Sequence, residues 1–302
     1  MSQPRFQVDA ADYTQHLEAL RHVRQTVFVQ EQQVPLEEEW DALDPLCQHV
    51  IARDEQGQPI GTGRLTPEHK IGRMAVLREW RGQGVGDALL LALMQQAQLR
   101  HWSEVSLNAQ VSAESFYARH GFVPHGPRFW EAGIEHQAMR RRLGGPTAIE
   151  DVHAARSLLT ALIGQARRQL LIYSRDLDPG LFDQPAVLDA LRRLATRPEP
   201  VEIRILLQDA ATPQRLLAPL LPLAQRLPSS LLFREIDDPV DRNYPSAYVA
   251  NDAGGYYFRP LGNRFDGEAE LDGPGRARQL REEFARIWER SRACSEYRAL
   301  GI

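Results

Sequence analysis

The chain has 302 residues, of which 43% are hydrophobic and 25% charged, and its formal net charge is −4 at pH 7. A chain of this length can bury a sizeable core and predicts about two domains rather than one. Because the charge balance is slightly acidic, no nucleic-acid partner is expected.

Targeting signals and cysteines indicate where the protein works. No stretch is long and apolar enough for a membrane span, and the first residues, MSQPRFQVDA, lack the apolar region of a signal peptide. Cys47 and Cys294 lie far apart in the sequence and have no metal-ligand spacing. We therefore expect a cytoplasmic protein with no membrane association and no bound metal.

The first half of the chain has the pattern of a mixed α/β domain. The predicted elements, in order, are a helix within 13–32, strands at 48–54, 59–65 and 70–77, a helix at 87–99, a strand at 103–110, a short helix within 112–122 that Gly121 ends, and a strand across 129–143. Helices and strands in this order predict one mixed sheet flanked by helices.

The stretch RRRLGGPTAIED, residues 140–151, marks the predicted domain boundary, because its glycines and proline interrupt any regular element. We therefore expect domains at 1–145 and 146–302. The second domain is predicted to contain helices within 149–167, 184–197 and 214–227, and strands at 169–174, 201–209 and 230–237. This alternation predicts a second α/β fold.

A glycine-rich loop at residues 81–86, RGQGVG, leads directly into the predicted helix at 87–99. Glycines at the start of a helix leave backbone N–H groups exposed to an anion, and the helix dipole favours negative charge there. A Walker A loop needs Lys and then Ser or Thr after its last glycine, and a dinucleotide loop needs Gly or Ala where Asp87 stands. Neither nucleotide motif fits, which leaves an R-x-x-G-x-G loop.

This loop resembles the pyrophosphate-binding loop of the GNAT acetyltransferases, and the stretches VRQTVFVQEQQVP, RMAVLREWRGQGVG, LNAQ and FYARHGF follow the order and spacing of that family over residues 5 to 143. The resemblance implies a GNAT fold that binds acetyl-CoA as cosubstrate, with a strand beside the pantetheine arm. The residues that it implies for acetyl-CoA binding are Met74, Ala75, Val76, Arg81, Gly82, Gln83, Gly84, Val85, Gly86, Asp87 and Asn108.

The resemblance also implies roles for two side chains near the reacting atoms, Tyr117 and Asn108. Tyr117 lies in ESFYARHGF, where the family places a tyrosine whose hydroxyl faces the coenzyme sulfur. A phenol there can protonate the leaving thiolate, although a half-buried tyrosine also commonly bonds a backbone carbonyl. Asn108 either bonds the pantetheine arm or holds the splay of the sheet.

The base that deprotonates the acceptor amine is left open between two acidic zones. Glu131 lies beside Phe129 and Trp130, whose burial of the carboxyl would raise its pKa. The other zone is LEEEWDALD, with Glu37, Glu38, Glu39, Asp41 and Asp44, although such a run is usually a solvated face. His49 and His136 lie in strand patterns and are interpreted as core histidines.

The second half resembles, less closely, one half of a phospholipase D-type domain. If Asp252 is aligned with the last residue of that family's H-x-K-x-x-x-x-D motif, Pro245 replaces the histidine and Ala247 the lysine. Without both groups there is no nucleophile and no phosphate contact. We therefore expect a non-catalytic domain that pairs with a second copy to form a homodimer, or a simple appended domain.

Three functions fit these observations. The leading hypothesis is an N-acetyltransferase that acts on a primary amine, either a small molecule or a protein. The alternatives are a non-catalytic acetyl-CoA sensor and an interaction module that recruits the acceptor. Tyr117 favours the enzyme, because a sensor needs no proton donor at the sulfur.

Overall fold

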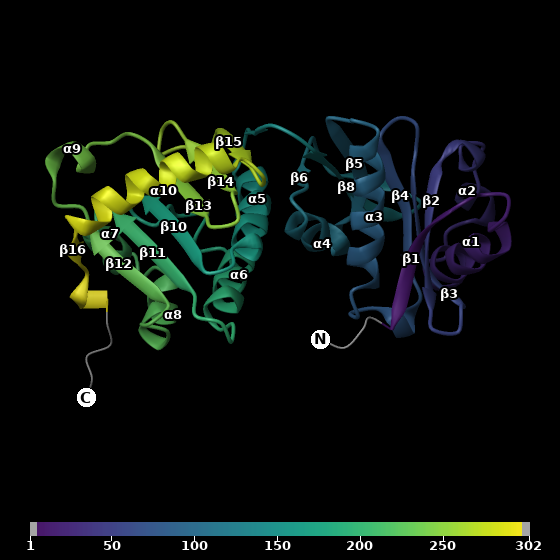
Figure 1. Ribbon diagram of the computed structural model, residues 1–302, viewed down its shortest axis with the longest axis horizontal. Helices are drawn as coiled ribbons and strands as arrows, with labels where there is room; N and C mark the ends of the chain where they lie inside the picture. The colour runs from purple at the N-terminus through teal and green to yellow at the C-terminus, as the bar shows by residue number, and fades with distance from the viewer. Residues whose placement is uncertain (1–4, 298–302) are drawn as a thin grey trace. The chain divides into compact units, whose positions relative to one another are not determined.

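A mixed β-sheet organises the N-terminal part of the chain in the computed structural model, which describes residues 5–297 (Figure 1). Its strands are β1 Phe6–Ala11, β2 Gln48–Asp54, β3 Pro59–Leu65, β4 Lys70–Val76, β5 Glu104–Gln110, β7 Phe129–Glu131 and β8 Ile134–Arg142. Among these seven strands the order is β1-β2-β3-β4-β5-β8, and β7 also pairs with β8; of the described pairings between them, β4–β5 is parallel and the others are antiparallel. The mixed sheet that the sequence predicts is confirmed.

Helical segments connect and cover this sheet. They are α1 Leu17–Arg24, the π-helix η1 Gln25–Glu31, α2 Leu36–Glu39, the short 3-10 turns η2 Asp44–Leu46 and η3 Arg78–Trp80, and α3 Val85–Leu99. Leu89 and Leu93 of α3 are fully buried against the sheet. The helix comes so close to β3 that a Cβ atom on Gly63 would lie 2.9 Å from the Leu93 side chain. Glycine at this position therefore allows the helix that follows the loop to lie directly on the sheet.

The chain divides into two compact units, and the main division falls at Gly144–Gly145. The segment Ser112–Pro124 belongs with the second unit, although the predicted boundary at residue 145 assigned it to the first domain. It contains α4 Glu114–Arg119 and β6 Val123–Pro124. Helix α4 packs against α5 Val152–Gln165, and Val123 joins the hydrophobic core of the second unit.

The second unit has a sheet of its own. Its strands are β9 Thr147–Ile149, β10 Gln169–Ser174, β11 Glu202–Leu207, β12 Leu231–Glu235, β13 Ala247–Asn251, β14 Tyr256–Arg259, β15 Gly267–Glu270 and β16 Arg292–Ala293. Their order is β16-β12-β11-β10-β13-β14-β15-β9, and only β10, β11 and β12 run parallel to one another. The antiparallel half, from β13 to β15, was not predicted from the sequence.

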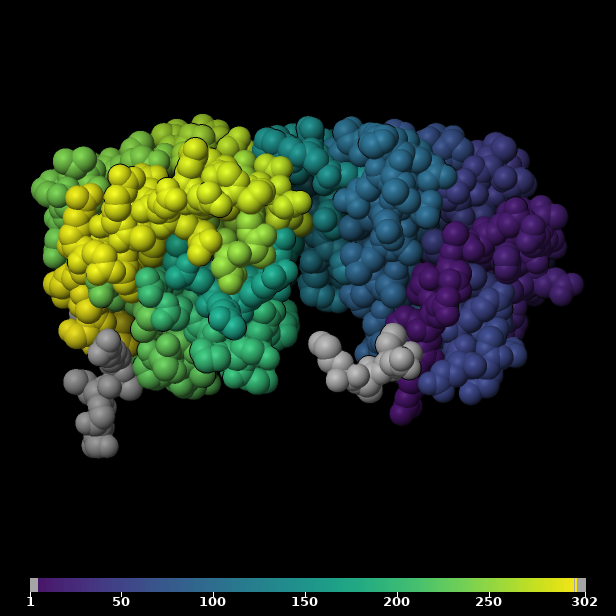
Figure 2. Space-filling model, viewed as in Figure 1, coloured from purple at the N-terminus to yellow at the C-terminus, as the bar shows by residue number. Residues whose placement is uncertain are grey.

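Helices cover both faces of this second sheet. They are α5, α6 Pro185–Ala195, α7 Ala211–Arg215, α8 Leu220–Arg226, α9 Pro239–Arg242, α10 Pro274–Glu289 and the 3-10 turn η5 Ser295–Tyr297. Along β10, Leu170 and Ile172 join the core that contains α5, whereas Leu171 and Tyr173 join the core that contains α10. Helix α10, yellow in Figure 2, covers part of the surface turned to the viewer.

Three predicted elements differ from the structure in helix type or in continuity. The helix expected within 13–32 changes from α to π hydrogen bonding at Gln25. The strand expected across 129–143 is the hairpin β7–β8, because Ala132 and Gly133 both have positive φ, +49° and +74°. The helix expected at 214–227 is divided into α7 and α8, with Leu217 at φ +51° between them.

Candidate functional site

The fourth strand carries an irregularity just before the glycine loop. Thr62 of β3 pairs with Ala75 of β4 and Arg64 pairs with Gly72, so two residues of β4 lie opposite Gly63 alone. One of these two is Arg73, whose φ of +50° is unusual for a residue with a side chain. This β-bulge bends β4 and re-aims the groups that follow it, a feature that recurs beside functional sites.

Strand β4 is also only partly paired on its other edge. Its parallel pairing with β5 consists of Lys70–Ser106 and Ile71–Leu107. The N–H of Leu77 donates to the carbonyl of Ile60 at 2.9 Å, so alternation along the strand directs the main-chain groups of Val76 to the edge that faces β5. Backbone donors and acceptors on this edge can therefore hydrogen-bond an extended ligand.

The glycine loop has the geometry of an anion-binding turn. Gly82 and Gly84 have φ of +75° and +86°, and a Cβ built on either meets no atom within 4 Å. Gly84 is the N-cap of α3, and no side chain caps this helix end. The first N–H groups of an α-helix have no carbonyl of the same helix to bond, because their acceptors would lie four residues earlier, and this applies to the N–H groups of Val85 and Gly86. They are therefore available to an anion in front of the loop.

Two side chains attach this loop to its surroundings. Arg81 donates from Nε to the Val76 carbonyl at 2.9 Å and from Nη2 to Glu31 Oε2 at 2.7 Å. Gln83 donates from Nε2 to the Glu79 carbonyl at 2.7 Å. The first and third residues of the loop are thus attached to segments that precede the loop, while Asp87 lies in the first turn of α3.

Tyr117 lies on α4 and is almost fully buried. Its ring makes edge contacts with Phe116 and Phe122, with centroids 5.0 and 5.9 Å away. Burial raises the pKa of Tyr117 to about 12, because the phenolate would lose its hydration. The hydroxyl therefore stays protonated at neutral pH and can serve as a proton donor.

Glu131 is exposed, and this differs from the environment expected for it. Trp130 beside it is 72% exposed and does not cover the carboxyl, because the two residues lie on the short outer strand β7. Asn108 Nδ2 donates to Glu131 Oε2 at 3.2 Å, which brings together two of the predicted site residues. The prediction that neighbouring aromatic rings shield the Glu131 carboxylate from water is wrong, and the carboxylate instead accepts a hydrogen bond from Asn108 of β5.

The acidic run at residues 36–44 has a largely structural role. Arg24 is 1% exposed and donates from Nε to Glu39 Oε1 at 2.5 Å and from Nη1 to Asp44 Oδ1 at 2.8 Å. Burial raises the pKa of Glu39 above its ordinary value even with Arg24 beside it. Burial also opposes the charge on Asp44, but hydrogen bonds from Arg24 and Arg64 bring its pKa below the ordinary value. The carboxylates of Glu39 and Asp44 therefore form buried ion pairs with arginines.

Asp41 extends this ion-pair network toward β4. Arg64 makes two hydrogen bonds to it, of 2.9 and 2.6 Å, and these hold the pKa of Asp41 at about 2. Arg73 reaches from the β4 bulge to the carbonyls of Glu38 and Glu39 at 3.0 and 3.2 Å. The network thereby fastens the segment that contains α2 to the irregular part of β4.

The two histidines in strands are held by main-chain carbonyls. His49 is buried, its Nε2 lies 2.8 Å from the Asp44 carbonyl, and burial lowers its pKa. His136 is half-buried, its Nδ1 lies 2.9 Å from the Ile134 carbonyl, and its ring stacks on Phe129. The interpretation of His49 as a core histidine is consistent with this burial, whereas His136 is only partly enclosed.

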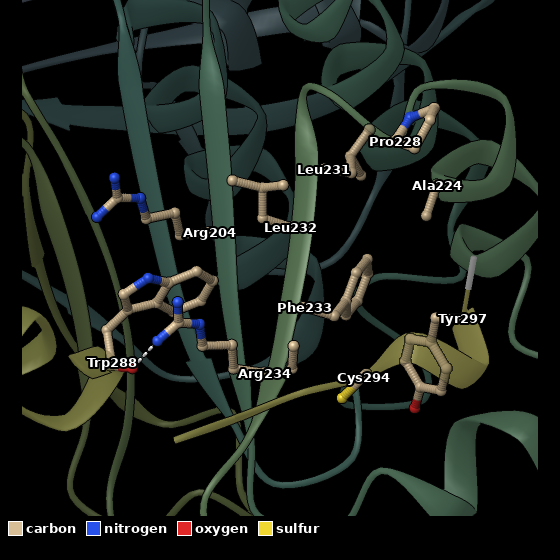
Figure 3. A pocket seen from close by; sticks show the side chains of 11 residues that line it. Arg204, Ala224, Pro228, Leu231, Leu232, Phe233, Arg234, Trp288, Cys294 and Tyr297 are labelled. Atoms are coloured by element: carbon tan, nitrogen blue, oxygen red, sulfur yellow. Dashed lines mark hydrogen bonds between the residues drawn. The ribbon is translucent and has the colours of Figure 1, made fainter. Parts of the chain in front are cut away.

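A cavity of about 250 Å³ in the second unit is lined by residues of β12 and of the elements beside it (Figure 3). Arg204 and Arg234 lie over the ring of Trp288 on one side of β12, at 5.4 and 4.7 Å from its centroid, and Phe233 and Tyr297 line the other side. Arg234 also donates to the Trp288 carbonyl. The arginines are thus engaged within the protein, and the residues that line this cavity all belong to the second unit.

Asp252, the residue aligned with the phospholipase D-type motif, has a local structural role. Its two carboxylate oxygens accept from the N–H groups of Arg167 and Arg168, both at 2.8 Å. Pro245 precedes β13, and Ala247 is its buried first residue. Within residues 5–297, no group of three or more His, Cys, Asp or Glu side chains could hold a metal ion, and no helix is long and apolar enough to cross a membrane.

Comparison with known protein families gives one match for each half of the chain. The GNAT acetyltransferase domain model matches residues 12–143, and a domain of unknown function, DUF7931, matches residues 151–300. The second match names no activity and does not support the resemblance to a phospholipase D-type domain. A solved acyl-CoA N-acyltransferase structure from Pseudomonas aeruginosa is 33% identical and covers 45% of this chain and 99% of that chain, at a TM-score of 0.41.

Curated relatives match the first half over most of their own length. The uncharacterized N-acetyltransferase YjcF of Bacillus subtilis is 39% identical over 124 residues, which is 40% of this chain and 88% of the relative. The uncharacterized protein YyaT of the same bacterium is 32% identical over 132 residues, 42% of this chain and 88% of the relative. Through its residues 12–143, the chain belongs to the GNAT family of acetyltransferases.

Proposed function

We propose that the protein transfers an acetyl group from acetyl-CoA to a primary amine by direct attack of the amine on the thioester. The observation that carries this proposal is the glycine turn at the start of α3, next to the part of β4 after Ile71, for which the described residues show no pairing with β5. The turn supplies backbone N–H groups and a helix dipole for a diphosphate. The edge supplies main-chain hydrogen bonds for an extended arm.

Each proposed binding residue has a defined task. Residues 82–86 bind the diphosphate through main-chain amides, while Arg81 orients the loop and Asp87 begins the helix behind it. Main-chain groups of Met74 and Val76 bind the pantetheine arm, with Ala75 between them on the strand, and an N–H of this strand polarises the thioester carbonyl. Asn108 completes the set from β5.

Two side chains are proposed to move protons. Tyr117 protonates the departing thiolate, and this role is supported by a phenol that carries its proton at neutral pH, as its pKa of about 12 requires. Glu131 accepts the proton of the attacking amine through water. Its exposure supports this role, since water has access to the carboxylate, and Asn108 orients it.

The test is a screen of small amines and peptides for release of free coenzyme A by the purified full chain. Release that depends on an amine supports the enzyme, and the preferred acceptor identifies the substrate class. Tight acetyl-CoA binding with no release for any amine or peptide would contradict the proposal and favour the sensor.

We also propose that the second unit is catalytically silent and mediates self-association. Leu216 and Leu217 are 61% and 84% exposed at the break between α7 and α8, which is an unusual place for adjacent leucines. Pro245 and Ala247 supply neither a nucleophile nor a phosphate ligand, whether or not this unit is related to phospholipase D. Both cysteines are free and buried, in keeping with our proposal of a cytoplasmic location.

Sedimentation of the full chain tests the association. We expect a dimer in the unaltered protein and a monomer when Leu216 and Leu217 are both replaced by Ser. Since isolated residues 146–302 would lack α4 and Val123, the full chain is the better material. A monomer at high micromolar concentration, or cleavage of a phosphodiester by the protein, would contradict the proposal.

A further inference from the structure

The π-helix η1 ends in an irregular turn at residues 32–34 that the proposed mechanism does not use. The N–H of Gln32 donates to the Val27 carbonyl, five residues earlier, at 3.2 Å, and the N–H of Val34 donates to the Phe28 carbonyl at 3.0 Å. Gln33 has φ of +59°, a strained value for a residue with a side chain. Such π-turns and strained residues recur at functional sites, where the surrounding structure maintains them.

This turn directs two consecutive side chains to two different strands. Glu31 Oε2 accepts from Arg81 Nη2 at 2.7 Å, and the same arginine bonds the carbonyl of Val76, the last residue of β4. Gln32 Oε1 accepts from Nε2 of Gln110, the last residue of β5, at 2.9 Å. Residues 31 and 32 therefore connect the ends of β4 and β5.

The connection lies where the sheet itself provides none. Strands β4 and β5 pair at Lys70–Ser106 and Ile71–Leu107, and the pairing found among the described residues goes no further. Beyond that point the separation of the two strands depends on side chains. The Gln32–Gln110 hydrogen bond is part-buried, so solvent competes with it less than with an exposed pair.

We propose that Glu31 and Gln32 are positioning residues that fix the separation of β4 and β5 beside the edge of Val76. This inference rests on the proposed function, because the ligand held at that edge is the pantetheine arm of acetyl-CoA. An arm that bonds main-chain groups needs them at a set spacing. Loss of the Gln32–Gln110 bond therefore weakens binding of acetyl-CoA and has little effect on the step that follows binding.

The experiment compares Gln32→Met, Gln110→Met and the double variant in the full chain, with Gln25→Met as the matched control. Methionine keeps the length of the side chain and removes its hydrogen bonds, and Gln25 is an exposed residue of the same π-helix. We expect each single variant to raise the Kd for acetyl-CoA by about threefold to tenfold, as for the loss of one hydrogen bond. The double variant should equal the single ones, since both remove the same bond.

A second measurement separates positioning from general stability and from the proposed function. Hydrogen exchange of the unliganded protein should accelerate at 72–76 and 108–110 in the Gln32 variant, while the melting temperature and turnover at saturation stay near those of Gln25→Met. Unchanged exchange and unchanged Kd would overturn the inference. Accelerated exchange in a protein that does not bind acetyl-CoA at all would instead overturn the proposed function and leave the strand connection standing.

Discussion

Arg81 donates a hydrogen bond from Nε to the main-chain carbonyl of Val76, 2.9 Å away. This contact joins the first residue of the glycine loop to the last residue of β4. The two parts of the proposed acetyl-CoA site are thus fixed to each other by a side chain that sequence analysis assigned only to cofactor binding. Arg81 is a ligand candidate and also a structural link.

Replacement of Arg81 by Met should raise the Kd for acetyl-CoA by about tenfold, because one charge-assisted contact is worth about 1.5 kcal/mol or more. Arg78→Met, in the turn just before the loop, is the control, since Arg78 is exposed. Calorimetry measures both. Equal affinity in the two variants would show that the Arg81–Val76 contact does not matter for binding.

Replacement of Tyr117 by Phe should lower turnover by roughly tenfold to a thousandfold, as expected when a general acid is lost. Acetyl-CoA affinity should change little, because the ring and its contacts with Phe116 and Phe122 remain. Steady-state kinetics and calorimetry on the same preparation check both parts. A variant with normal turnover would return Tyr117 to a purely structural role.

Replacement of Arg24 by Met should reduce the free energy of unfolding by about 3–5 kcal/mol. The variant leaves the carboxylates of Glu39 and Asp44 buried without the guanidinium that they share. The loss of stability from these buried charges is larger than the loss from the packing of the arginine side chain. Arg21→Met is the control, because Arg21 is exposed and also lies over the ring of Trp40, with its guanidinium 5.3 Å from the ring centroid. Denaturant unfolding at pH 7 measures the difference, and similar stability of the two variants would contradict the role of the network.

Asp41 should make stability depend on pH in the acid range. Its folded pKa of about 2 is below the ordinary value of 3.8, so its pairing with Arg64 stabilises the fold above pH 4 and is lost as the pH falls through about 2. At pH 7, Asp41→Asn should cost about 1–2 kcal/mol, and the difference from the unaltered protein should shrink between pH 4 and pH 2. A difference that is constant over this range would show that ionisation of Asp41 contributes nothing.

Local patterns were sufficient to predict much of the first unit. The strands predicted at 48–54 and 59–65 have the bounds of β2 and β3, because alternating patterns and the turn residues around Gly57 specify a hairpin without distant contacts. The helix after the glycine loop begins two residues earlier than expected, at Val85. Its apolar periodicity and the glycine before it are both local signals.

Features that depend on distant contacts could not be predicted in this way. The positive φ of Arg73 is stabilised by contacts with residues more than thirty positions away, and the π-turn at Gln32 has no residue pattern of its own. The acidic run at 36–44 has the composition of a solvated face, yet Glu39 is buried because Arg24 lies opposite it. In the second unit, β13 and β14 form a hairpin within the segment that was compared with the phospholipase D-type motif.

The most direct test of the central claim, that the glycine loop binds acetyl-CoA, is calorimetry on the unaltered protein, Gly84→Glu and Gly57→Glu. Both glycines have φ near +80° and open space at Cβ, but Gly57 lies in the β2–β3 turn, so the pair matches backbone strain and added charge. We predict that the unaltered protein and Gly57→Glu bind acetyl-CoA, and that Gly84→Glu does not, because its carboxylate occupies and repels the diphosphate position. Normal binding by Gly84→Glu would contradict the account.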